Sequence, residues 1–153
     1  RLLVYANEFR IEALIASAAG TRGELKDSVT RPDLILQVIE AYGDVVQNLK
    51  RHTTGWPEAE ELRSVVRSGN RLRERPHIGA QFDTDASKLI VERIDAGSEA
   101  DPLNISIWGG QTDLAQALWR VKHDRGHDGL AAFVRKFRAY DINDQDGIAE
   151  WMK

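Results

Sequence analysis

The sequence predicts an α/β domain with parallel strands, and three observations support this prediction. Short segments of β character at residues 11–17, 103–107 and 138–142 are separated by stretches with apolar residues at helical spacing. Strands that alternate with helices are typical of βαβ units, whose right-handed crossovers place the strands parallel to one another. The chain has 153 residues, which is enough for one domain with one compact core.

The composition excludes several classes of protein. With 21 Lys+Arg against 24 Asp+Glu the net charge is −3, which argues against a nucleic-acid partner. No apolar run approaches the roughly 20 residues that span a bilayer, so we expect no membrane partner. The absence of cysteine excludes disulfides and cysteine nucleophiles. The four tryptophans are scattered, which favours core packing over a sugar-stacking platform.

The two ends of the chain have the pattern of cut helices. Residues 2–9 have helical apolar spacing with no capping residue or signal-peptide layout before them. Residues 148–153 form an apolar helical turn with no Gly or Asn to end it. We therefore expect an internal piece of a longer protein, truncated at both ends. Residues 11–17, partly β-branched and followed by small residues, predict a buried strand.

Two helices are predicted next. Thr30 and Asp33 have the spacing of a capping box, so we expect Thr30 to begin a helix that continues through residues 34–49. A second helix follows Pro57 and ends near Gly69. Its inner face is expected to carry Leu62, Val65 and Val66.

An exposed loop and a third helix follow. Residues 70–83 are rich in Arg, Pro, His and Gly, which predicts an exposed loop. Thr84 or Asp85 can cap the next helix, and Gly97 lies just beyond its end.

The last third of the chain predicts strand, helix, strand and helix. Along residues 103–107 apolar side chains alternate with Asn104, Ser106 and then Trp108, so this strand is not uniformly apolar. Leu114 and its neighbours mark the following helix, which we expect to break at Gly126, with Asp128 as a cap for the part beyond. Residues 138–142 predict a strand, and Asp144 can cap a final helix.

Three loops follow the three predicted strands. Ligands of open parallel sheets bind outside the carboxyl ends of the strands. If the strands are neighbours, residues 17–21, 109–113 and 141–146 line one rim, where their oxygen atoms suit a hard cation such as Ca²⁺. Alternatively, the glycines only turn the chain while Thr112 and Asp144 only cap helices. The residues by themselves leave both interpretations open.

Five segments carry a resemblance to a known family. GQTDLAQAL at residues 110–118 is similar to the Gly-Pro-Leu-Thr-Asn-Leu-Ala-x-Ala-Leu segment of inosine-uridine nucleoside hydrolases. Residues 2–12, 31–34, 108–119 and 140–146 resemble the bacterial nucleoside hydrolase-like domain family, which includes cellulose-binding proteins of the Sde182 type. The resemblance implies a Rossmann-like three-layer α/β sandwich with a mainly parallel sheet, and it makes residues 1–153 part of one such domain.

The resemblance also implies a chemistry. In nucleoside hydrolases a Ca²⁺ ion, held mainly by an N-terminal Asp cluster, activates water for attack on the anomeric carbon of an N-glycosyl bond. By match, the backbone carbonyl of Thr112 would contact the metal. The residues that would contact a nucleoside or sugar substrate are Thr21, Asp113, Asn143 and Asp144. No residue of this chain is assigned a catalytic role.

The departures from the hydrolase pattern are important for function. The Asp cluster would precede Arg1, and Thr21 and Asp113 stand where hydrolases have asparagine. We therefore expect this chain to be inactive by itself, although a longer protein containing it would hydrolyse N-glycosyl bonds. The alternatives are a non-catalytic carbohydrate-binding module that binds cellulose and a purely structural domain. The resemblance implies a periplasmic or secreted location, and the oligomeric state is not determined.

Overall fold

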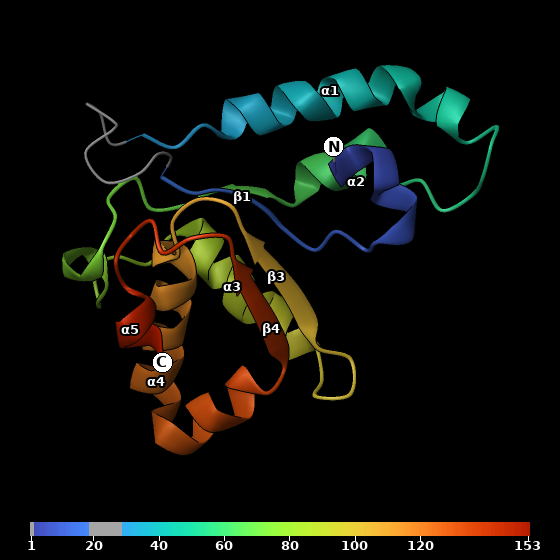
Figure 1. Cartoon of the computed structure of the whole chain (residues 1–153). Helices are drawn as coiled ribbons and strands as arrows, with labels where there is room; N and C mark the ends of the chain where they lie inside the picture. The colour runs from blue at the N-terminus through green and yellow to red at the C-terminus, as the bar shows by residue number, and fades with distance from the viewer. Residues whose placement is uncertain (1, 19–28) are drawn as a thin grey trace.

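The computed structural model describes residues 2–18 and 29–153 and has a mixed α/β architecture (Figure 1). Within these residues, short parallel strands form two separate pairs, β1 with β2 and β3 with β4. In chain order the elements are η1 (Leu2–Glu8), β1 (Leu14–Ala16), α1 (Pro32–Leu49), α2 (Ala59–Ser64), β2 (Val66–Ser68), η2 (Arg75–His77), α3 (Asp85–Ala96), β3 (Leu103–Ile107), α4 (Thr112–Val134), β4 (Phe137–Asp141) and α5 (Ala149–Met152).

The first pair of strands packs against α1 and α2. β1 and β2 run parallel with Leu14 opposite Val66, and the N–H of Gly69 donates to the carbonyl of Ala16 just beyond the register. The Tyr42 hydroxyl donates a 2.7 Å hydrogen bond to the carbonyl of Pro57, which ties α1 to the segment before α2. The core here consists of Ile39, Tyr42, Val46 and Leu62, with Leu14 and Val66 packed against it.

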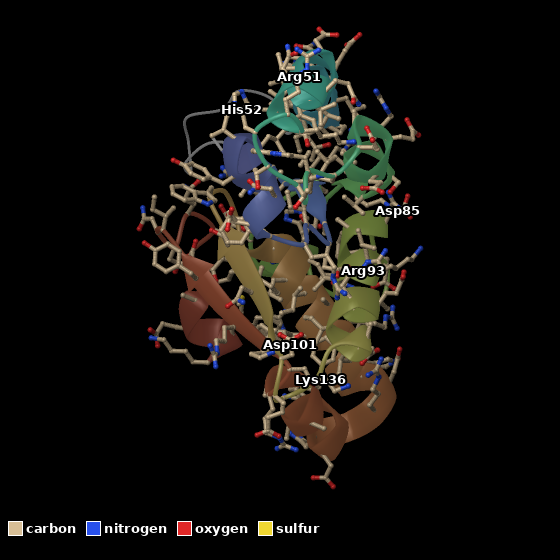
Figure 2. The ribbon with its side chains drawn as sticks, turned by 90° about the vertical axis from the view of Figure 1, so that its right-hand side faces the viewer. Arg51, His52, Asp85, Arg93, Asp101 and Lys136 are labelled. Carbon is tan, nitrogen blue, oxygen red and sulfur yellow. The ribbon has the colours of Figure 1, made fainter. Side chains whose placement is uncertain are left out.

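The second pair of strands packs against α3 and α4. β3 and β4 are parallel from Leu103 opposite Phe137 to Ile107 opposite Asp141, and Figure 2 shows α3 on one side of this pair. Ile15 of β1 also packs against this core, so β1 contributes neighbouring residues to both cores, as the alternating faces of a strand allow. The core consists of Ile90, Ile94, Ile107, Leu114, Ala117, Val121 and Phe133.

Most predicted elements are confirmed in type, although several are shorter. Thr84 caps α3, since its hydroxyl oxygen accepts a 3.0 Å hydrogen bond from the N–H of Ser87. Gly97 follows the end of α3 as expected. At the predicted break, Gly126 has a φ of 69°, which is not helical, and α4 is kinked there. Residues 2–9, predicted to be helical, form the 3₁₀ helix η1.

Two predictions in the first half are wrong. Thr30 does not cap α1, because Arg31 occupies that position without a side-chain cap and Pro32 has no N–H to satisfy. Instead, the hydroxyl of Thr30 lies 2.6 Å from that of Ser68. The second helix ends before the predicted Val66 and Gly69, because Val66–Ser68 pairs with β1 as a strand.

Two further expectations are corrected. Residues 70–83 are not uniformly exposed, because Asn70 and Ile78 are buried against the start of α4 and its neighbours. The strands of the described residues form two pairs, which supports an α/β fold with parallel strands but not one continuous sheet. Among the helices described, none combines the length and apolar character needed to cross a lipid bilayer.

Candidate functional site at the strand ends

The carboxyl ends of β1, β3 and β4 lie together, as the sequence predicted. Beyond β1 and β3, a Cβ placed on Gly109 would lie 2.7 Å from the Ser17 hydroxyl. Between the loops after β3 and β4, the Gln111 amide donates to Asp141 at 2.5 Å and to Asp144 at 3.2 Å. Polar side chains from separate loops therefore meet on one side of the molecule.

Asp146 anchors the first residue of α4. Its Oδ2 accepts hydrogen bonds from the Thr112 N–H at 2.9 Å and from the Thr112 hydroxyl at 2.6 Å. Both side chains are buried. A Cβ on Gly110 would lie 2.2 Å from the Asp146 carboxylate, so only glycine allows this close approach. The second glycine of the Trp-Gly-Gly-Gln junction is thereby explained.

Asp113 points into the protein. It is 4% exposed, and its Oδ1 accepts hydrogen bonds from the Asn70 N–H at 2.9 Å and the Thr84 hydroxyl at 3.0 Å. Burial raises the pKa of Asp113 to about 6, although both of these hydrogen bonds act in the opposite direction. A Cβ on Gly69 would lie 2.1 Å from the other carboxylate oxygen, so glycine is again required.

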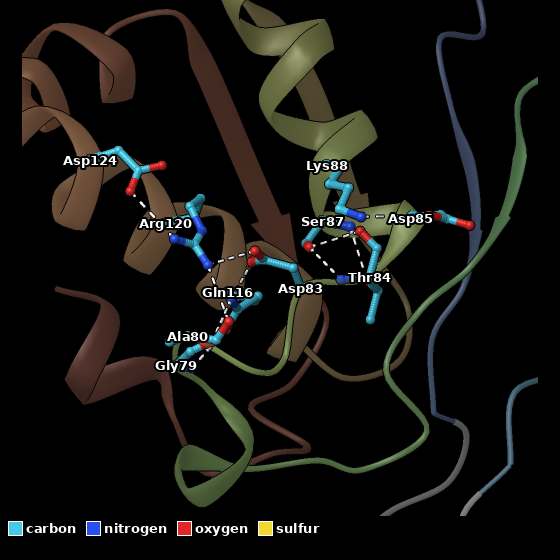
Figure 3. Close-up of polar contacts among 10 residues, drawn as sticks. All are labelled: Gly79, Ala80, Asp83, Thr84, Asp85, Ser87, Lys88, Gln116, Arg120 and Asp124. Carbon is cyan, nitrogen blue, oxygen red and sulfur yellow. Dashed lines mark hydrogen bonds and ion pairs between the residues drawn. The ribbon is translucent and has the colours of Figure 1, made fainter.

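Side chains of α4 hold the loop that supplies Thr84 (Figure 3). Gln116 is fully buried, and its amide accepts from the Gly79 N–H at 2.8 Å and donates to Asp83 at 2.6 Å. Arg120 donates to the other oxygen of Asp83, also at 2.6 Å. Thr84 follows directly, where it both caps α3 and donates to Asp113. The network therefore positions the N-termini of α3 and α4 relative to each other.

The loop after β4 carries the exposed part of the site. Asp144 accepts hydrogen bonds from the N–H groups of Ile148 at 2.9 Å and Ala149 at 3.3 Å at the start of α5. The prediction that Asp144 caps this helix is nevertheless wrong in position, because Ile148 occupies the N-cap. Asn143 is exposed beside it. Burial raises the pKa of Asp141, and the charges of Asp144 and Asp146 act in the same direction.

The structure places the predicted site residues in different surroundings. It brings Thr112, Asp113 and Asp144 together at the strand ends, and Thr21 lies outside the described residues. The roles assigned to all of them, and to Asn143, stay predictions. Sequence reasoning did not single out Gln111 or Asp146, which join the two loops. Their position in loops that follow neighbouring parallel strands was the available signal.

The described residues do not by themselves fit a calcium ion. Among them there is no group of three or more acidic, His or Cys side chains that could hold a metal. The carboxylates of Asp113, Asp144 and Asp146 already accept hydrogen bonds from the protein. Asp141 Oδ1 and Asp146 Oδ1 are buried without a partner, whereas Ca²⁺ takes about six to eight oxygen ligands.

Aromatic side chains are exposed next to the hydrogen-bonded loops that follow β3 and β4. Trp108 follows the last residue of β3 and is 69% exposed, while Tyr140 of β4 is 63% exposed. The expectation that the tryptophans pack in the core is wrong for Trp108 and also for Trp151 of α5, which is exposed too. Strand alternation explains the exposure of Trp108, because Ile107 points into the core and the next side chain must point away from it.

Comparisons with known proteins agree on one family. The family model described as cellulose-binding Sde182, nucleoside hydrolase-like domain, matches residues 1–153. A solved structure of a nucleoside hydrolase-related hypothetical protein from Saccharophagus degradans, associated with carbohydrate metabolism, is 31% identical to this chain with a TM-score of 0.88. The match covers 98% of this chain and 35% of that protein, so the chain spans about a third of its relative. No curated protein matches the chain.

Proposed function

The chain belongs to the nucleoside hydrolase-like domain family of cellulose-binding Sde182, and from this membership we propose that it is a non-catalytic carbohydrate-binding domain. Its proposed ligand is a neutral, cellulose-type polysaccharide. The main supporting observation is that Asp113, Asp144 and one oxygen of Asp146 already accept hydrogen bonds within the protein. Cleavage of an N-glycosyl bond by metal-activated water needs oxygen ligands that remain available to the ion.

Two measurements on the purified chain test this proposal. We expect it to sediment with microcrystalline cellulose and to bind soluble cellohexaose in calorimetry. We also expect no release of base from inosine or uridine in the presence of calcium chloride, measured by chromatography of the products. Absence of binding to both glucans, or calcium-dependent release of base, would overturn the proposal.

A second candidate concerns a longer protein that contains this domain. Asp141 Oδ1 and Asp146 Oδ1 lack partners at the strand ends, so acids from outside residues 1–153 could complete a calcium site with them. Such a protein would release base from nucleosides, and a chelator would abolish the activity.

Location in the periplasm or outside the cell suits a polysaccharide ligand, and cell fractionation with an antibody to the chain tests it.

A further inference from the structure

We propose that the outer face of the β3–β4 pair, with Trp108 and Tyr140 at its centre, is the surface on which sugar rings stack. This inference rests on the proposed function and assigns it a location. The outer face is defined by six side chains at alternate positions of the two strands and their ends. They are Asn104, Ser106 and Trp108 from β3 and its end, and Arg138, Tyr140 and Ile142 from β4 and its end.

The strand register places Trp108 and Tyr140 at diagonal positions on one face of the strand pair. Ser106 lies opposite Tyr140, and the N–H of Ile142 donates to the carbonyl of Ile107, which extends the parallel pairing by one residue. Trp108 is two positions beyond Ser106 on the same face, so it is the diagonal neighbour of Tyr140. Both aromatic residues therefore belong to the same face of the strand pair.

All six side chains of the outer face are exposed. The opposite face of β3 carries Ile105 and Ile107, which pack against α3 and α4. Outside the core, Gln145 donates a 3.4 Å hydrogen bond to the carbonyl of Trp108, which ties the backbone that carries the indole to the loop after β4. The rings therefore lie on a supported strand pair and remain open to solvent.

The composition of the outer face favours a carbohydrate over a covering layer of helices. Parallel strands buried on both faces are rich in Val, Ile and Leu, and a three-layer sandwich would cover this face in that way. Here the polar residues Asn104, Ser106 and Arg138 accompany the two aromatic residues, and Ile142 is the one aliphatic side chain among the six. A pyranose ring has an apolar C–H face that stacks on an aromatic ring and a rim of hydroxyl groups that needs polar partners.

The charge of the outer face also suits a neutral ligand. Arg138 is the one charged residue among its six, and the acidic side chains of Asp141 and Asp146 belong to the buried network behind it. A glucan is uncharged, so the surface that binds it needs no cluster of oppositely charged side chains. Bound sugars would add apolar contacts to the two rings and hydrogen bonds to the short polar side chains between them.

The test measures binding of cellohexaose by calorimetry and of microcrystalline cellulose by sedimentation. We expect Trp108→Ala and Tyr140→Ala each to weaken cellohexaose binding about tenfold, the size of one aromatic stacking contact. Trp108→Phe retains a ring and should bind within about twofold of wild type. Trp151→Ala is the matched control, because Trp151 is partly exposed on α5, where it contacts Arg75.

Each outcome separates this inference from the proposed function. If the wild type binds neither glucan, the proposed function fails and this inference fails with it. If the wild type binds and Trp108→Ala and Tyr140→Ala bind equally well, the outer face is not the binding surface, and carbohydrate binding by another surface survives. Circular dichroism of each variant checks that the fold is intact.

Discussion

Two neighbouring regions of this molecule differ in whether their side chains are buried and hydrogen-bonded or exposed to solvent. In the buried network, Gln111, Thr112 and Asp113 are at most 4% exposed and bind protein groups. On the outer face, Trp108 is 69% exposed only three residues before Gln111. The acids and amides, which suggest ligand binding in the sequence, stabilise the fold. Trp108, which the sequence analysis assigned to the core, is exposed to solvent.

Removal of Asp146 should produce the largest effect in this comparison. Asp146→Ala leaves the buried N–H and hydroxyl of Thr112 without their acceptor, and each unpaired group costs about 1–3 kcal/mol. We expect the free energy of unfolding in urea to fall by about 3 kcal/mol. Asp146→Asn keeps one oxygen acceptor and should lose less. An alanine variant as stable as the wild type would show that Asp146 is not a structural residue.

Titration of Asp113 should produce an intermediate effect with a defined sign. In the folded protein the pKa of Asp113 is about 6, and in the unfolded chain it returns to about 3.9. The folded state therefore binds the proton more tightly, so the stabilising contribution is complete below about pH 4 and is lost as pH rises through about 6.

The matched variant for this titration is Asp113→Asn, which has no charge to bury. Between pH 4 and pH 7 its free energy of unfolding should rise relative to wild type by about 2–3 kcal/mol, as measured by urea unfolding at each pH. Other acids titrate in both proteins and cancel in the difference. A difference that does not change with pH would contradict the burial of an ionisable Asp113.

Replacement of the outer-face aromatics should have the smallest effect on stability. Trp108→Ala and Tyr140→Ala remove side chains that are mostly in water, so we expect the free energy of unfolding to change by less than about 0.5 kcal/mol. The measurement is urea unfolding without any glucan present. A loss of 2 kcal/mol or more would mean that these rings support the fold, and the contrast between the two regions would disappear.

The elements that the sequence predicted well depend on local signals. The apolar period of α1, the Thr84 cap and Gly97 end of α3, and the alternation along β3 each require only a few neighbouring residues. The strand β2 was missed because its residues form a strand only with β1 beside them, which is distant in the sequence.

For the candidate site, the sequence predicted the meeting of the loops but not the state of their side chains. Parallel strands place their carboxyl ends at one edge, and this rule was enough to bring Thr112 near Asp144. It could not show that Asp113 faces inward, because the partners of Asp113 arrive from the segment before α3.

The sequence by itself determined the family, the alternation of strands and helices, and the convergence of strand-end loops, since periodicity and capping act over a few residues. Only the tertiary structure decided which polar groups are buried and which aromatic rings are exposed to solvent. Burial and hydrogen bonding depend on segments that are far apart in the chain and meet when it folds. Asp113 and Trp108, five positions apart, ended in opposite environments for this reason.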